Sequence, residues 1–231
     1  MQRAIIAVAV GMLWMCSLTA NGATAGKAAA DELVVAGGGE TEALIIASPQ
    51  PGREEKLAAQ DLAKYIGMMA GATPQVVSDR DAINEALNSD VPLLVLGQEA
   101  LKAAPGLRKD LREAAKDNPQ LKADAIVLKR EGNRVYVTGN HDGSHYYAAA
   151  ELLRRWGCRW YMPTEFGECI PENETLKVGD LDHAYGSPFE VRTYWVSWVG
   201  SNKGRPEFKR RNMMTDRRIP PSGHALGKYT R

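Results

Sequence analysis

Apolar residues follow two periods along the chain, an alternating one typical of strands and a longer one typical of helices. Strands are predicted at residues 33–36 and 43–47. A helix is predicted after Pro51-Gly52, and Gly71 follows it in the position of a C-cap glycine. The apolar stripe of this helix contains Ala58, Leu62, Tyr65, Ile66 and Met69.

The later patterns predict further strands and helices up to about Asp182. The apolar run at residues 92–97 is typical of a strand buried on both faces. Residues 125–129 and 134–138 flank a glycine-bearing turn and predict a β-hairpin. Two further helices are predicted at residues 81–87 and 105–116, and a third begins near Asp142 or Ser144, either of which can cap it, and ends at Gly157. The other predicted strands are 75–77, 158–162, 168–170 and 175–178. This alternation indicates the α/β (α+β) class, with a mixed β-sheet flanked by helices.

The first 25 residues have the pattern of a secretory signal peptide. Arg3 carries their only charge, an almost entirely apolar run extends from Ala4 to Leu18, and Ala23-Thr24-Ala25 supplies the small residues of a cleavage site. A lipoprotein signal ending at Cys16 is the alternative, but the bulky Met15 precedes that cysteine. We therefore expect a periplasmic or secreted protein that has no membrane anchor after cleavage.

Without this leader the chain has 28 basic and 28 acidic residues, a balance that provides no global field to attract nucleic acid. The basic segments Lys209-Arg210-Arg211 and Arg217-Arg218 lack interleaved aromatic residues, and we interpret them as a solvated or unfinished surface. Because this tail is expected to lack partners, residues 200–231 should be cut quickly by proteases, whereas residues 26–185 should resist.

No motif for metal or nucleotide chemistry is found, because HExxH, CxxC, GxSxG and GxxxxGK are all missing, so no cofactor is expected. His141, Asp142 and His145 could offer ligands to zinc, but Asp142 is already explained as a helix cap, and no metal is predicted. Cys158 and Cys169 permit either one disulfide or two unpaired thiols. The glycosylation pattern that begins at Asn173 is interpreted as a surface loop.

Six aromatic residues gather within a short stretch, and such side chains suit both sugar stacking and domain interfaces. Trp156 and Trp160 lie in elements patterned as core, so packing is expected there. Trp195 and Trp198 follow a linker signal, and together with Arg192 they suit an interface or a binding site as well as burial. The six residues of this cluster are Trp156, Trp160, Tyr161, Tyr194, Trp195 and Trp198.

Several of these segments together resemble the N-terminal accessory domain of alpha-glucuronidases, and the related domain of beta-hexosaminidases is similar too. The resemblance covers roughly residues 32–200 and rests on the order of its parts. The segments are AAQDLAKYIGMMAGATPQVV at 58–77, LLVLG at 93–97, and DAIVLKREGNRVYVTGNHDGSHYYAAAELLRRWGCRWYMPTEFGECIP at 124–171. The signature within the last segment is Gly139, Gly143, Ala149, Leu152, Leu153, Gly157, Arg159, Trp160, Tyr161 and Pro163.

The resemblance implies a mixed sheet that precedes a (β/α)8 barrel, with the glycosidic chemistry performed in the barrel. Arg192 matches an arginine that holds a sugar hydroxyl in the hexosaminidase relatives; a structural ion pair is the alternative. Phe208 to Asn212 look like the first barrel helix, and His224 is a candidate site residue near the second strand. With Trp195 from the aromatic cluster, the predicted substrate-binding set is Arg192, Trp195 and His224.

Residues 186–231 are expected to be a linker and the incomplete first unit of such a barrel, which needs about 250 residues. No residue matches the catalytic acids of the relatives, so no catalytic residue is predicted. We expect the accessory domain (residues 26–185) of an exported glycoside hydrolase acting in polysaccharide or glycan breakdown, inactive alone and partnered by carbohydrate through the full-length enzyme. The alternatives are a stand-alone carbohydrate-binding module and an interaction domain that docks on a separate barrel chain.

Overall fold

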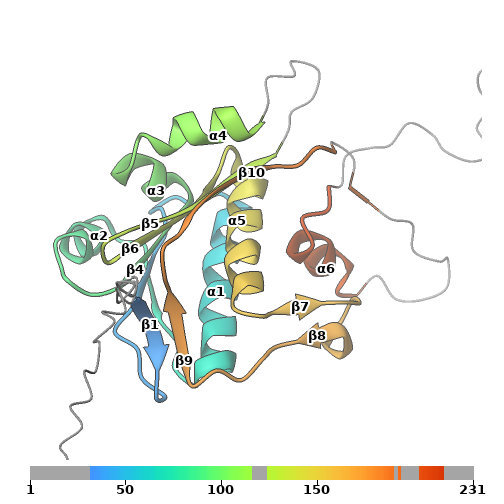
Figure 1. The fold of residues 1–231 in the computed structure, drawn as a ribbon, viewed down its shortest axis with the longest axis horizontal. Helices are drawn as coiled ribbons and strands as arrows, with labels where there is room; N and C mark the ends of the chain where they lie inside the picture. Colours follow the sequence, from blue (N-terminus) through green and yellow to red (C-terminus); the bar gives the residue numbers. More distant parts are fainter. Residues whose placement is uncertain (1–31, 116–123, 190–191, 194–202, 216–231) are drawn as a thin grey trace, which may run out of the picture. The chain divides into compact units, whose positions relative to one another are not determined.

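The computed structural model describes residues 32–115, 124–189, 192–193 and 203–215 (Figure 1). Its centre is a sheet of six strands in the order β10-β5-β6-β4-β2-β3. Four strands run parallel to one another, namely β2 (Leu44–Ile46), β3 (Gln75–Val77), β4 (Leu93–Leu96) and β6 (Arg134–Gly139). The antiparallel strands β5 (Ala125–Glu131) and β10 (Asp182–Gly186) complete the sheet. This mixed sheet confirms the α/β class.

Helices cover both faces of the sheet (Figure 1). On one face lie α1 (Arg53–Ala70) and α5 (Asp142–Arg155). On the other lie α2 (Arg80–Leu87), α3 (Gly97–Ala103) and α4 (Leu107–Ala115). Successive strand residues point to opposite faces, so Leu94 packs with α1 whereas Val95 packs beneath the other three helices. The apolar run at 92–97 is thus doubly buried, as predicted.

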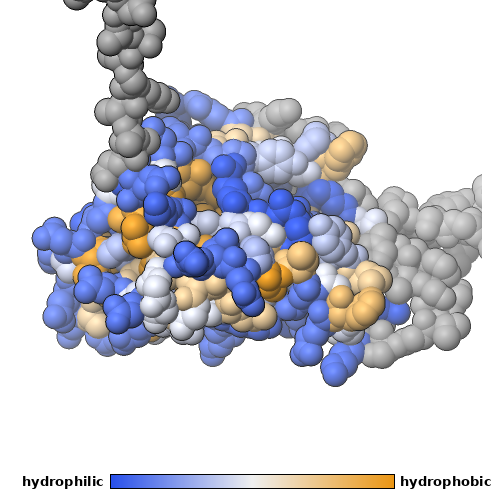
Figure 2. Space-filling model, turned by 60° about the horizontal axis from the view of Figure 1, so that its bottom comes forward, coloured by the Kyte–Doolittle hydropathy of each residue, from blue (hydrophilic) through white to orange (hydrophobic). Residues whose placement is uncertain are grey.

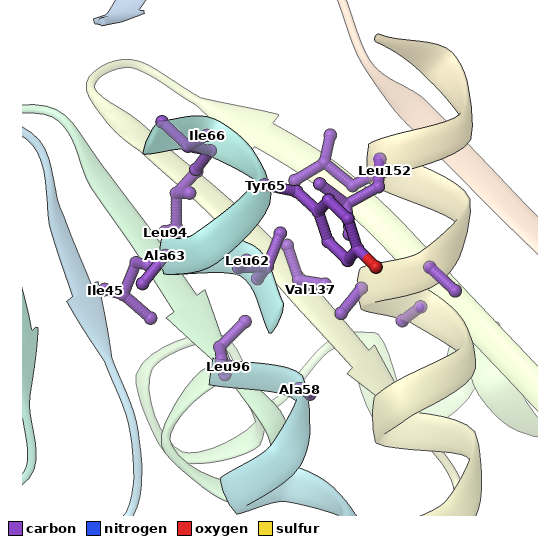
Figure 3. Close-up of a cluster of buried hydrophobic side chains, with 14 of the residues drawn as sticks. Ile45, Ala58, Leu62, Ala63, Tyr65, Ile66, Leu94, Leu96, Val137 and Leu152 are labelled. Carbon is purple, nitrogen blue, oxygen red and sulfur yellow. The ribbon is translucent and has the colours of Figure 1, made fainter. Parts of the chain in front are cut away.

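The larger core cluster lies between the sheet and the helix pair α1 and α5, as Figure 3 shows. Leu62 and Ile66 of α1 lie over Ile45 and Leu94, and all four side chains are fully buried. Burying one such side chain stabilises the fold by about 1.5 to 3 kcal/mol. The predicted stripe of α1 is therefore the face that it buries, and Gly71 caps the helix in the left-handed conformation with φ 74°.

Two small sheets accompany the main one. Strand β1 (Leu33–Gly37) pairs antiparallel with β9 (Thr175–Val178), and β7 (Arg159–Trp160) pairs with β8 (Glu168–Cys169). A 3₁₀ turn, η1 (Glu165–Gly167), joins β7 to β8. The last element of the described residues is α6 (Arg205–Arg211), which packs against α5.

Two elements, α3 and β10, are absent from the sequence prediction. Helix α3 starts at Gly97 directly after β4, so no polar turn separates strand from helix. Strand β10 lies at the edge of the sheet and has no buried residue, so it lacks the apolar signal of a strand. None of the helices in the described ranges is both long and apolar enough to cross a membrane.

Candidate functional site

The carboxyl ends of the parallel strands form the edge where ligands bind in many α/β folds. Here β2 leads to α1, β3 to α2, β4 to α3 and β6 to α5, so four helix starts lie at this edge. Free backbone N–H groups at helix starts attract anions. This edge of the sheet is therefore the first candidate for a functional site.

Glu55 of α1 occupies this edge and is 1% exposed. Its Oε1 accepts a hydrogen bond from the Ser48 N–H at 2.9 Å, and its Oε2 accepts one from the Gln98 N–H at 3.4 Å. Burial raises the pKa of Glu55, and the two backbone hydrogen bonds oppose that rise. The carboxylate thus joins the ends of β2 and β4 through their backbone.

Asp142 of α5 caps α1 rather than its own helix. Its carboxylate oxygens accept hydrogen bonds from the N–H groups of Glu54 at 3.0 Å and Glu55 at 3.1 Å. The start of α5 is capped instead by His141 and Ser144, which form a reciprocal capping box. The N-cap residue is His141, which was not predicted; Ser144 takes part in the cap only by accepting from the His141 N–H at 2.9 Å. The prediction for Asp142 is wrong because a tertiary partner takes its carboxylate. The edge is thus filled by the carboxylates of Glu55 and Asp142.

His145 lies beneath the same edge and is 2% exposed. Its Nδ1 accepts a hydrogen bond from the Gly139 N–H at 3.0 Å, and its Nε2 lies 3.2 Å from Nε2 of Gln98. Burial lowers the pKa of His145 from 6.5 to about 4, opposed by the charge of Asp142 and reinforced by that of His141. The imidazole is therefore neutral at pH 7. Within the described ranges, no three His, Cys, Asp or Glu side chains are grouped to hold a metal ion.

We expect the domain to lose stability as the pH falls from 6.5 towards 4. In this pH range His145 is protonated in the unfolded chain but stays neutral in the folded domain, because its pKa is about 6.5 in the first and about 4 in the second. The free energy of unfolding therefore falls by about 3 kcal/mol between these two pH values. Urea unfolding of the unmodified protein and of His145→Gln between about pH 7 and pH 4 measures this loss. The lowered pKa of His183 acts in both proteins, so their difference isolates His145. If the free energy of unfolding of the two proteins fell equally with pH, His145 would not be the group responsible.

Asp124, His141 and Ser144 are the residue types of a hydrolytic triad, but their geometry is that of a helix cap. His141 Nε2 lies 2.5 Å from Asp124 Oδ1, while its Nδ1 accepts from the Ser144 N–H at 3.3 Å. The Ser144 hydroxyl donates to the His141 carbonyl at 2.8 Å and is fully buried. Since the imidazole contacts the amide and not the hydroxyl of Ser144, it activates no nucleophile.

Arg192 binds the other oxygen of Asp124. Its Nη2 pairs with Asp124 Oδ2, its Nε donates to the Met213 carbonyl at 2.7 Å, and its Nη1 donates to the Phe189 carbonyl at 2.6 Å. Burial alone raises the pKa of Asp124, but the hydrogen bonds from His141 and Arg192 outweigh burial and lower it. The structural ion pair weighed for Arg192 is therefore present, and its sugar-binding role stays a prediction.

The interpretation of the Lys209-Arg210-Arg211 segment as solvated is wrong for its two arginines, whose side chains are each 12% exposed. Arg210 Nε lies 2.5 Å from Glu54 Oε2. Arg211 contacts Asp61 at 3.1 Å and Glu168 at 2.6 Å. Phe208, 9% exposed, completes the contact, so the described part of the tail has the partners that its composition did not suggest.

The other predicted residues have mixed outcomes. Trp160 is 4% exposed and belongs to the core, as expected, and Trp156 packs partly buried against it. Cys158 is a buried free thiol and Cys169 an exposed one, so they are not joined. The Asn173 amide donates to the Trp156 carbonyl at 3.3 Å and is half-buried, so this surface loop turns its asparagine inward.

Trp195, Trp198 and His224 lie outside the described residues, as do the leader, Cys16 and the Arg217-Arg218 pair. Sequence reasoning missed Glu55, although a signal existed. Glu55 precedes Ala58 by three residues and Leu62 by seven, which places it on the apolar stripe of α1. An acidic residue on a buried face needs a partner and is a sign of a structured polar site.

No protein-family model matches the chain, and no curated protein matches it.

Proposed function

We propose that residues 26–185 form the non-catalytic accessory domain of an exported, alpha-glucuronidase-like glycoside hydrolase that acts in polysaccharide or glycan breakdown. One observation carries the proposal: the segment after β10 is fastened to this domain by the partly buried ion pairs of Arg192, Arg210 and Arg211. An accessory domain needs such an attachment to hold the unit that follows it in a fixed orientation.

The attachment contacts both helices of the larger core face. Arg211 pairs with Asp61 of α1 and with Glu168 of β8, while the Tyr147 hydroxyl of α5 donates to the Met214 carbonyl at 2.9 Å. Partly buried ion pairs add little net stability, but they define geometry because a misaligned pair leaves a desolvated charge. These contacts therefore favour a role in orientation.

Four buried or half-buried acids of the described domain support a non-catalytic role. Glycosidases use two carboxylates that flank the scissile bond, one of which must donate a proton. Glu55 and Asp142 accept backbone hydrogen bonds, Asp124 is held by His141 and Arg192, and Glu99 pairs with Arg80 at 3.0 Å and Lys102 at 2.7 Å. Each of these acids already has a structural partner.

The purified chain is expected to release no product above the buffer rate from aryl glucuronides or aryl N-acetylhexosaminides. Circular dichroism and a cooperative urea transition show that the assayed protein is folded. Turnover that rises in proportion to protein concentration and persists through repurification would overturn the proposal. If the Glu165→Gln or Glu207→Gln variant then lost that turnover, the replaced residue would be identified as a catalytic acid.

Replacing Arg211 by glutamine is expected to release α6 while the rest of the domain stays folded. As long as α6 stays docked, the change leaves Asp61 and Glu168 without the cation that they share, which costs about 3 to 5 kcal/mol. Detachment of α6 exposes both carboxylates to water and so removes most of this cost. Amide hydrogen exchange in residues 203–215 should accelerate by at least about tenfold, whereas that of β4 should not change. Arg112→Gln on the exposed face of α4 is the matched control. Unchanged exchange in α6 would refute the attachment.

A carbohydrate-binding module is a second candidate because one exposed aromatic side chain, that of Phe166, lies beside a cleft of the domain.

A further inference from the structure

A cleft of about 490 Å³ lies between the β7–β8 hairpin and α6. Trp160 and Phe208 contribute apolar surface, Met162 and Phe166 come from the hairpin loop, and Lys64 comes from α1. Its volume is within the range of small-molecule sites, about 300 to 1,000 Å³. The cleft is thus built from three elements that are distant in the sequence.

Phe166 is the most exposed large apolar side chain of the described residues, at 87%. The surface drawn in Figure 2 is mostly polar, with apolar side chains in small groups. Burying a phenylalanine is worth about 1.5 to 3 kcal/mol, and the fold gains little of this from Phe166. An aromatic ring held open beside a cleft suits a ligand with an apolar face.

The loop that carries Phe166 is held in one shape. The Tyr161 N–H donates to the Gly167 carbonyl at 2.8 Å, and the Gly167 N–H donates to the Thr164 carbonyl at 3.1 Å. Thr164 has φ 75° and ψ 169°, a conformation that costs a residue with a side chain about 1 to 3 kcal/mol. A strained residue at the rim of a cleft is typical of binding loops, and here it lies two residues before Phe166.

The charged floor of the cleft is already paired. Glu168 Oε1 accepts hydrogen bonds from the Tyr65 hydroxyl at 3.0 Å and from Arg211 at 2.6 Å, and its Oε2 lies 3.8 Å from Lys64. The Trp160 indole N–H donates to the Tyr65 oxygen at 3.1 Å. These groups hold one another in place and keep the floor rigid beneath the exposed rim.

The lining of the cleft has no net charge. Lys64, Lys203 and Arg211 supply three positive charges, and Glu165, Glu168 and Glu207 supply three negative charges. Such a lining gives no preference to a polyanion, and its carboxylates and ammonium groups can bond to hydroxyls as acceptors and donors. A pyranose ring combines an apolar C–H face with a rim of hydroxyls, which matches an aromatic ring beside paired charges.

We propose that this cleft binds a neutral oligosaccharide, with Phe166 stacked on the apolar face of one sugar ring and Glu165 and Glu207 bonded to its hydroxyls. The proposal rests on the proposed role in glycan breakdown and adds to it the ligand class and the place of contact. In such a role the domain would hold a glycan chain, and no bond of that chain would be broken in the cleft.

The test is titration of the full chain with cellohexaose, xylohexaose and N-acetylchitohexaose, followed by nuclear magnetic resonance and calorimetry, with an aldouronic acid as the charged probe. Phe166→Ala should weaken binding of a neutral probe by at least about tenfold, as expected for a central aromatic contact. Phe189→Ala is the matched control, because Phe189 is 68% exposed and lies outside the cleft lining; it should change the affinity by less than about twofold.

Weaker binding of a neutral probe by Phe166→Ala, with the affinity of Phe189→Ala unchanged, supports the proposal. Failure of all three neutral probes to bind, tighter binding of the aldouronic acid, or equal affinity of the two variants overturns it. Self-association that Phe166→Ala abolishes also overturns it, because the cleft would then receive a second copy of the chain. Product release in the same samples would instead overturn the non-catalytic role, so the two proposals fail separately.

Discussion

Replacing Glu55 by alanine is expected to lower the free energy of unfolding by roughly 3 to 5 kcal/mol. The change leaves the buried N–H of Ser48 and the part-buried N–H of Gln98 without their acceptor, and a buried orphaned group costs about 1 to 3 kcal/mol. It also opens a cavity between the ends of β2 and β4, where the side chain is 1% exposed.

Urea unfolding monitored by circular dichroism measures the loss at pH 7. Glu113→Ala is the matched control, since the Glu113 side chain on α4 is 67% exposed and forms only a 3.7 Å surface pair with Lys109; it should change stability by about 0.5 kcal/mol or less. Equal losses for the two substitutions would show that Glu55 contributes no more than a surface charge.

Replacing Gly97 by alanine is expected to cost about 4 kcal/mol. A Cβ atom on Gly97 would lie 2.5 Å from Cδ and from Oε2 of Glu55, well inside the van der Waals distance. Gly97 also has φ +50°, where a side chain adds strain. The close approach of the start of α3 to the Glu55 carboxylate therefore requires glycine at this position.

Two further variants separate these causes. Gly132→Ala has a similar φ of +61° with no atom near the new Cβ, so it should cost only about 1 kcal/mol. The double variant Glu55→Ala with Gly97→Ala should cost clearly less than the sum of the single changes, because removing the carboxylate removes the clash. Additive losses, or an equal cost for Gly97→Ala and Gly132→Ala, would contradict the steric account.

The regular elements with strong apolar periods could be predicted from the sequence. Helix α1 and strand β4 agree with prediction because their buried faces coincide with the apolar pattern. Strand β10 could not be predicted in this way, since its partners are the backbone groups of β5 and its side chains are exposed or half-buried. Pairing of an edge strand depends on its neighbour's backbone, which leaves no periodic signal.

The polar contacts were harder to predict, because their partners are distant in the sequence. Arg211 pairs with Asp61, 150 residues earlier, so the local composition of the tail indicated a solvated segment. Local capping rules assigned Asp142 to the helix that contains it, whereas its carboxylate binds the N–H groups of Glu54 and Glu55. A rule based on neighbours in sequence cannot choose between two helix starts that the fold brings together.

The cap that Asp142 supplies to α1 affects the order in which the domain folds. The carboxylate and the amide of Glu54 are separated by 88 residues, so the first turn of α1 cannot acquire its cap until α5 has docked on the sheet. The central and last turns of α1 can form earlier through their apolar stripe, because they need only local chain and nearby strands. The start of α1 should therefore belong to the late-forming part of the folding transition, and a substitution at Asp142 should speed unfolding far more than it slows folding.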